Sequence, residues 1–135
     1  MRNLCLAIGL LLVALHAHAM EVSVRPAGLL LSGEIRPGDY DRLINFFQSD
    51  PKKFVTTQNF LLDSPGGSVP EALKIALFIR DTSRVTNVEA KSNCLSACFY
   101  LFVAGGSRTA AADGSVGIHR PYYNPHQFGA RRIQA

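Results

Sequence analysis

Residues 61–69, LLDSPGGSV, pass from an apolar run through a Pro-Gly-Gly turn to the start of a helix. The apolar run 60–62, bounded by that turn, predicts a short buried strand. Ser68 is followed three residues later by Glu71, which is the capping-box pattern of a helix N-terminus. A strand that leads through a tight turn into a helix is the repeating unit of α/β folds.

The rest of the chain continues this alternation. Apolar residues with helical spacing predict three helices, the first of them capped by Asp39. Short apolar segments between turn signals predict the strands. We therefore expect an α/β domain with a largely parallel sheet, because each predicted helix can supply a crossover between parallel strands. The expected helices are 39–47, 68–80 and 97–104, and the expected strands are 29–35, 60–62, 86–90, 108–111 and 116–119.

The first residues predict an exported protein. Arg2 precedes a nearly unbroken apolar stretch, 4–15, and residues 17–19 (AHA) form a small-x-small cleavage site, as in secretory signal peptides. The stretch is shorter than the roughly 20 residues of a membrane helix, so we expect a signal peptide at 1–19 rather than a transmembrane anchor. The mature domain, 20–135, would then be periplasmic or secreted, without a stable membrane span.

The charge distribution gives little support to nucleic-acid binding. The formal net charge is +4, and the basic residues are scattered apart from Arg131 and Arg132. No stripe of Lys and Arg interleaved with aromatic residues is present. We therefore expect a soluble domain whose partner is not a nucleic acid.

Three features could carry chemistry, and each has a simpler explanation. The turn 65–67 could present backbone N–H groups as an oxyanion hole, or be an ordinary strand-to-helix turn. Ser96, at the start of the helix 97–104, could be a nucleophile or only an N-cap. His119, at the end of an apolar segment, could be a general base or a structural histidine.

Together these features resemble the proteolytic subunit of Clp protease and its exported relatives in the ClpP/crotonase superfamily. The stretches that carry the resemblance are 61–69 (LLDSPGGSV), 93–98 (NCLSAC) and 117–121 (GIHRP). It covers roughly residues 29–122, most of the mature domain. The resemblance implies repeated β-β-α units around a mainly parallel sheet.

The resemblance also implies a set of roles. Ser96 would attack a peptide carbonyl, and His119 would accept its proton and pass it to the leaving amine. The backbone N–H groups of Gly67 and Ala97 would hold the oxyanion. Related signal-peptide peptidases use a lysine base, whereas the histidine context here favours the Clp-type arrangement. The chemistry requires no cofactor and no metal.

The sequence departs from the family pattern after the histidine. The family's third triad member is an aspartate well downstream, but no Asp or Glu follows Asp113 in this chain, and the projecting helix that builds Clp rings is missing too. The chain would then be a fragment, a Ser–His dyad or inactive, and we expect a fragment first. Whether Asp63 or Asp113 replaces the acid stays open. A homo-oligomer is compatible with the resemblance, but a Clp-like ring is not expected.

The two cysteines of the mature domain, Cys94 and Cys98, allow several interpretations. A zinc clip with His119 and His126 has an unusually wide His spacing. A redox pair normally has the spacing C-x-x-C, and two reduced core cysteines are a further alternative. In an oxidising compartment we expect a disulfide, which requires Cys94 to lie outside the helix. This bond would stiffen the turn that carries Ser96.

The function expected from these features is that of an exported serine endopeptidase acting on peptide or protein substrates. The alternative is a non-catalytic module that binds a peptide or acyl group on the same fold. An acyl-CoA enzyme of the crotonase kind is a third option, but CoA is not expected outside the cytoplasm.

Overall fold

The computed structural model describes residues 19–119. The predicted signal peptide up to residue 18, His126 and all other residues after His119 lie outside the described residues. None of the helices in 19–119 combines the length and the apolar character that a membrane span requires.

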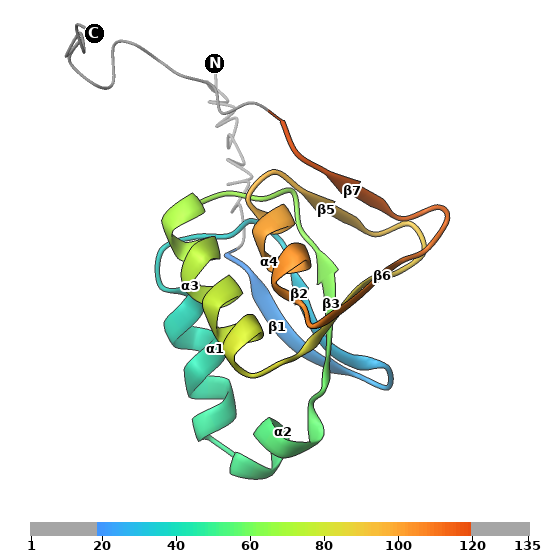
Figure 1. Cartoon of the computed structure of the whole chain (residues 1–135). Coiled ribbons are helices and arrows are strands. Elements are labelled where there is room, and N and C mark those ends of the chain that lie inside the picture. Colours follow the sequence, from blue (N-terminus) through green and yellow to red (C-terminus); the bar gives the residue numbers. More distant parts are fainter. Residues whose placement is uncertain (1–18, 120–135) are drawn as a thin grey trace, which may run out of the picture.

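A five-stranded sheet forms the centre of the molecule, in the order β1-β2-β3-β4-β6 (Figure 1). The first pair is an antiparallel hairpin, and all the other neighbours are parallel. The sheet is therefore mainly parallel, as expected from the alternating sequence pattern. Its strands are β1 (Glu21–Arg25), β2 (Gly28–Ser32), β3 (Asn59–Asp63), β4 (Val85–Val88) and β6 (Ser107–Ala110).

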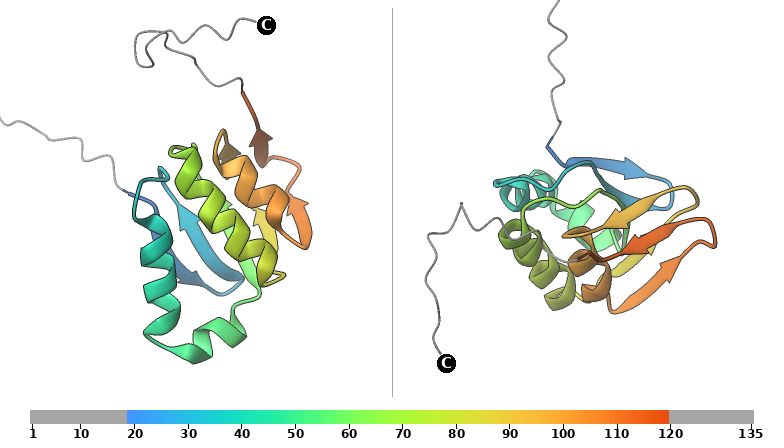
Figure 2. Two further views of the ribbon diagram at one scale, coloured as in Figure 1. Left: turned by 60° about the vertical axis from the view of Figure 1, so that its left-hand side comes forward. Right: turned by 90° about the horizontal axis from the view of Figure 1, so that it is seen from above.

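The helices α1 (Asp39–Gln48), α3 (Val69–Asp81) and α4 (Cys98–Ala104) lie on the same face of this sheet (Figure 2). The short α2 (Pro51–Thr56) lies at the end of the molecule opposite to the start of α3 (Figure 1). The helices connect successive parallel strands: α1 and α2 lie between β2 and β3, α3 between β3 and β4, and α4 between β4 and β6.

The core lies between the sheet and the helices. It is built from alternate residues of the strands and from the inward stripe of each helix, as expected for a sheet with one face covered by amphipathic helices. Burying these side chains is the main favourable term in the stability of the domain. Buried members include Leu29, Leu31, Phe60, Leu62 and Val88 from the sheet and Leu43, Ile75, Ile79 and Leu101 from the helices.

A second sheet of two parallel strands, β5 (Asn93–Leu95) and β7 (Ser115–Gly117), lies beside the first (Figure 1). Ser64, which follows β3, links the two sheets. Its N–H donates to the carbonyl of Asn93 at 2.6 Å, and its own carbonyl accepts from the N–H of Leu95 at 3.0 Å. The turn after β3 is therefore fixed to β5, the strand that leads to Ser96.

Two sequence-based assignments at helix starts need correction. Gly38, with φ +94°, is the N-cap of α1, and Asp39 is the first residue of the helix, where its carboxylate accepts from the Arg36 N–H. Ser68 caps α3 as predicted, because its Oγ accepts from the Glu71 N–H at 3.4 Å. The second bond of a capping box is missing, however, because the Glu71 carboxylate does not accept from the Ser68 N–H. That N–H donates instead to the carbonyl of Ile35 at 2.8 Å.

Candidate active site

Ser96 lies between the end of β5 and the start of α4, in a left-handed backbone conformation with φ +55°. This conformation is uncommon for a residue other than glycine. The N-cap of α4 is Ala97, so the interpretation of Ser96 as a simple helix cap is wrong. A serine on a strained turn from strand to helix presents its Oγ at the surface of the turn, as in the nucleophile elbow of hydrolases. The Ser96 residue is half-buried.

Contacts on both sides hold this conformation. The Ser96 N–H donates to the carbonyl of Gly117 at 2.8 Å, and the Ser96 carbonyl accepts from the Phe99 N–H at 3.0 Å. A disulfide joins Cys94 to Cys98 around it, with 5.1 Å between the two Cα atoms. Cys94 lies in β5, outside the helix, as the predicted disulfide required. Because the sulfurs are bonded to each other, neither is available as a zinc thiolate or a reduced core cysteine.

The glycine turn packs directly against Ser96. A Cβ atom on Gly66 would lie 2.7 Å from the Ser96 Cβ and 2.6 Å from the Leu95 carbonyl oxygen, which is closer than side chains tolerate. Gly66 also has φ +98°, and its N–H donates to Ser64 Oγ at 3.1 Å. Glycine is required at this position both for the backbone conformation and for the close approach.

Several backbone N–H groups of this region have no acceptor within residues 19–119, among them those of Val69 and Cys98 at the starts of α3 and α4. The N–H groups of Gly67 and Ala97, the two residues predicted to form an oxyanion hole, also have none. Gly67 is exposed, whereas Ala97 is only 1% exposed. A buried N–H without an acceptor is rare and costs free energy unless water or a ligand satisfies it. Such donors are the groups from which an oxyanion hole is made.

A small pocket brings together three of the predicted site residues. Its volume is about 130 Å³, and it is lined by Val69, Ser96, Ala97, Tyr100, Ile118 and His119. The parallel pairing of β5 with β7 explains the arrangement. Leu95 lies opposite Gly117, so the segments that follow the two strands, with Ser96 and His119, leave the small sheet at the same end. Gly67 does not line this pocket; the turn reaches Ser96 through Gly66.

Neither candidate for a triad acid lines the pocket. The Asp63 carboxylate accepts a hydrogen bond from the Asn93 N–H at 2.9 Å, which ties the end of β3 to β5. Asp113 is exposed in the turn between β6 and β7. Both residues therefore have positions explained by the fold alone.

Glu71 is a buried carboxylate that the sequence placed only in a capping box. Its Oε1 accepts from the N–H groups of Gly38 and Tyr40 at 3.1 and 2.9 Å, and Lys74 Nζ lies 3.0 Å from Oε2. Burial raises its pKa, but the hydrogen bonds from Tyr40, Lys74 and Gly38 and the charge of Lys74 outweigh burial and leave the pKa lowered. Glu71 thus joins the start of α3, next to the glycine turn, to the start of α1.

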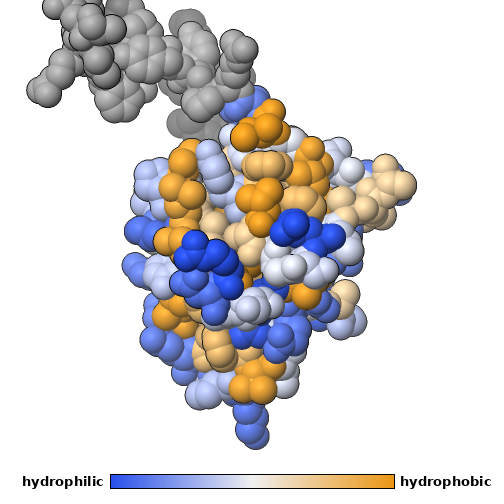
Figure 3. All heavy atoms as spheres, in the orientation of Figure 1, coloured by the Kyte–Doolittle hydropathy of each residue, from blue (hydrophilic) through white to orange (hydrophobic). Residues whose placement is uncertain are grey.

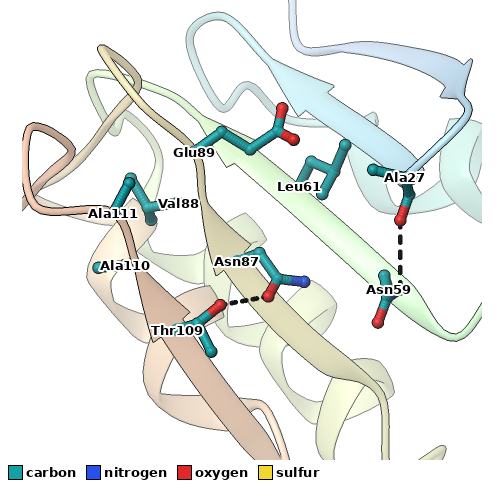
Figure 4. A pocket seen from close by; sticks show the side chains of 9 residues that line it. All are labelled: Ala27, Asn59, Leu61, Asn87, Val88, Glu89, Thr109, Ala110 and Ala111. Carbon is teal, nitrogen blue, oxygen red and sulfur yellow. Dashed lines mark hydrogen bonds between the residues drawn. The ribbon is translucent and has the colours of Figure 1, made fainter.

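Larger hollows lie away from Ser96. One of about 420 Å³ lies on the other face of the sheet, where Asn59 and Leu61 of β3, Asn87 of β4 and Thr109 of β6 lie on neighbouring strands and Glu89 follows the end of β4 (Figure 4). Another of about 490 Å³ is apolar and is lined mainly by residues of α1 and α2 with Phe78. Neither contains a nucleophile beside a base. Within residues 19–119, no three His, Cys, Asp or Glu side chains are grouped so that they could hold a metal ion.

Sequence reasoning did not find three of the pocket residues, Val69, Tyr100 and Ile118. Tyr100 could have been found from helical spacing, because it lies three residues after Ala97 and therefore on the same side of the predicted helix 97–104. The role of Ile118 depends on the pairing of β5 with β7, which has no local signal in the sequence.

No family model and no curated protein matches the sequence. The structure is similar to a mutant of the 1510-N membrane-bound stomatin-specific protease, with a TM-score of 0.54 and 18% identity, covering 68% of this chain and 46% of that one. It is also similar to an enoyl-CoA hydratase from Thermoplasma volcanium, with a TM-score of 0.50 and 16% identity, covering 73% of this chain and 50% of that one.

The fold is therefore of the ClpP/crotonase type. One of the two neighbours is a protease and the other a hydratase, so the architecture is one on which enzymes are built. At identities of 16–18% the similarity applies to the fold and not to the activity. The chain spans about half the length of both solved structures.

Proposed function

We propose that this protein is a serine peptidase in which Ser96 is the nucleophile and His119 the general base. The observation that carries the proposal is the strained backbone of Ser96 at a pocket that His119 also lines. Strain of this kind costs of order 1–3 kcal/mol and is concentrated at functional sites. Ser83 and Lys91 have similar positive φ but do not line the pocket, so the combination of this backbone with the neighbouring His119 supports the proposal.

The reaction would follow the two-step course of acyl transfer. Ser96 Oγ attacks the carbonyl carbon of the peptide while its proton passes to the imidazole of His119. The N–H groups of Gly67 and Ala97 donate to the oxyanion, and His119 then gives the proton to the departing amine. Water then attacks the acyl-enzyme while His119 accepts its proton, and His119 gives this proton to Ser96 Oγ as the acid product leaves, which regenerates the Ser96 hydroxyl and the neutral imidazole.

We also propose that the peptidase acts outside the cytoplasm. The disulfide between Cys94 and Cys98 supports this assignment, because such bonds persist in oxidising compartments and are rare in the cytosol. The signal-peptide pattern at 1–19 points the same way. A peptide or protein substrate is therefore one that meets the enzyme after export.

The test is covalent labelling of the purified protein with a fluorophosphonate probe, with the site mapped by mass spectrometry. We expect labelling at Ser96 that disappears in Ser96→Ala and falls at least 100-fold in His119→Ala. Ser115→Ala, which removes an exposed serine of β7, is the matched control and should label like the wild type. Absence of labelling in the folded wild type would refute the peptidase and favour a module that binds peptides or acyl groups without cleavage.

A further inference from the structure

A second cavity, between α3 and α4, adjoins the pocket at Ser96. The pocket itself has a volume of about 130 Å³. The second cavity, of about 200 Å³, is formed by Leu73, Ala76, Leu77 and Arg80 of α3 and by Tyr100, Val103 and Ala104 of α4. Both helices start at the side of the molecule where the glycine turn meets Ser96, so the two cavities follow one another along the same pair of helices (Figure 1).

Tyr100 is the one residue that lines both cavities. On α4, Ala97, Tyr100 and Ala104 are spaced three and four residues apart and therefore share one face of the helix. Ala97 lines the cavity on the Ser96 side of Tyr100, and Ala104 lines the cavity on the other side. Tyr100 is thus the residue that the two cavities share, and it lies at the boundary between them. We call the two cavities together the groove.

The part of the groove beyond Tyr100 is apolar and open to solvent. Leu73, Leu77 and Val103 are 44%, 48% and 43% exposed. Apolar side chains gather over α3 and α4 on this face of the molecule (Figure 3). A contiguous exposed apolar surface beside a pocket marks a place where an apolar group binds.

We propose that Tyr100 sets the length of the apolar group that the site accepts beside Ser96, and that the groove beyond it is a blocked extension of the same subsite. This inference deepens the proposed function and rests on it for the identity of the acyl group. An engineered protein cavity of about 150 Å³ holds a single benzene molecule. The pocket before Tyr100 is therefore the size for one short aliphatic side chain or an acyl chain of about four carbons, and a longer chain meets the ring.

The first test compares the hydrolysis of p-nitrophenyl butyrate and p-nitrophenyl octanoate. We expect the wild type to prefer butyrate, and Tyr100→Ala to raise the octanoate-to-butyrate ratio of kcat/KM by about tenfold or more, since one methylene in an apolar pocket is worth about that much. Tyr100→Phe keeps the ring and should keep the wild-type ratio. Tyr100→Leu provides a smaller change if Tyr100→Ala does not fold, and should shift the ratio in the same direction.

A further variant tests where the longer acyl chain of octanoate binds. Leu77→Gln makes the far part of the groove polar. In the Tyr100→Ala background it should return the octanoate-to-butyrate ratio of kcat/KM toward the wild-type value. A ratio that does not respond to Tyr100→Ala, or a gain that Leu77→Gln does not reverse, would overturn the proposal. An unchanged ratio together with concentration-dependent sedimentation would indicate that a second copy of the chain covers the groove.

The second test does not require a reactive serine. In the Ser96→Ala background, 1-hexanol is added to ¹⁵N-labelled protein with and without Tyr100→Ala. Because the far part of the groove is open to solvent, hexanol can bind there with Tyr100 present, so the test is whether binding in the two parts is coupled. We expect the amide resonances of Ile118, in the Ser96 pocket, and of Leu73, Leu77 and Val103, beyond Tyr100, to titrate with one common Kd only when Tyr100 is replaced. If the two sets already share one Kd with Tyr100 present, the ring is not a barrier and the proposal fails, even if Ser96 labels. If neither the wild type nor any Tyr100 variant hydrolyses the esters, but hexanol binding gives the expected dependence on Tyr100, the peptidase function fails and the division of the groove stands.

Discussion

The backbone N–H of Ser96 donates to the carbonyl oxygen of Gly117 at 2.8 Å. This bond joins the turn of the proposed nucleophile to the strand that ends two residues before His119. It extends the ladder of β5 and β7 by one step beyond the pair Leu95–Gly117. Ser96 and His119 are therefore brought together by a two-stranded sheet and not by the five-stranded one.

The left-handed backbone of Ser96 predicts a trade between stability and reactivity. Ser96→Gly should abolish fluorophosphonate labelling and raise the free energy of unfolding by about 1 kcal/mol, because glycine adopts positive φ without the steric cost that other residues pay. Ser96→Ala should abolish labelling without this gain. Urea denaturation followed by circular dichroism measures the difference.

Lys91 offers a matched control for the backbone effect. It also has positive φ, +62°, but it is exposed in the turn between β4 and β5 and does not line the pocket. Lys91→Gly should give a similar gain in stability with labelling retained. Equal stability of Ser96→Gly and Ser96→Ala would argue against strain at Ser96.

The close contact of Gly66 with the Ser96 turn predicts a large effect of a single methyl group. Gly66→Ala should lower the free energy of unfolding by about 3 kcal/mol, combining the cost of positive φ with a clash against the Leu95 carbonyl and Ser96. It should also suppress labelling, because the turn can relieve the clash only by moving Ser96. Thermal unfolding and labelling of the same sample would measure both effects.

Gly38→Ala separates backbone strain from the clash. Gly38 has nearly the same φ, +94°, but an added Cβ there would meet only the end of the Arg42 side chain, at 4.0 Å. This variant should lose about 1 kcal/mol and label normally. A loss as large as that of Gly66→Ala would show that crowding at Ser96 is not the cause.

The Cys94–Cys98 disulfide should stabilise the domain by about 2 kcal/mol, because closing a loop of this length lowers the chain entropy of the unfolded state by that amount. Replacing both cysteines by alanine should therefore lower the free energy of unfolding by that amount in oxidising buffer and reduce labelling at Ser96. Both cysteines are fully buried, so dithiothreitol should reduce the bond slowly unless urea is added. Unchanged stability and labelling in the double variant would refute a role for the bond in holding the turn.

Glu71 predicts a loss of stability in acid. Its pKa in the folded protein lies below the ordinary value of 4.5, because hydrogen bonds from Tyr40, Lys74 and Gly38 outweigh the opposing effect of burial. The carboxylate therefore stabilises the fold at pH values above 4.5, and this contribution disappears as the pH falls through the folded-state pKa. Urea unfolding measured between pH 3 and 7 should show this decline, and Glu71→Gln should weaken it.

At pH 7, Glu71→Gln should cost about 2 kcal/mol, since hydrogen bonds to a buried charge are lost. Glu34→Gln is the control, because Glu34 forms only an exposed ion pair with Arg36 and should change stability by less than about 0.5 kcal/mol. Parallel pH dependence of the wild type and Glu71→Gln would exclude Glu71 as the titrating group.

The sequence was most informative where structure depends on neighbours along the chain. The strand before the glycine turn, the Ser68 cap and the helix that follows it have strong local signals, and all three are present. The strand β1, the short α2 and β5 were not expected. β1 and β5 are short and gain their hydrogen bonds from β2 and β7, so their formation depends on tertiary pairing that local propensity does not reveal.

For the site, too, the sequence was informative only where the signal is local. Ser96 and His119 could be singled out from residue type and context, and the structure places both at one pocket. The positive φ of Ser96 and the partners of Glu71, more than 30 residues away in the sequence, arise from packing between distant segments and have no local signature. Glu71 was therefore assigned to a capping box when its carboxylate holds the start of another helix.

The bond between Cys94 and Cys98 also bears on when the site can exist. The cytosol keeps thiols reduced, so a chain made there and then exported would gain this bond only after crossing the membrane. During synthesis, the turn around Ser96 would lack its covalent closure. A peptidase built in this way would be less active inside the cell that makes it and would reach full activity on oxidation.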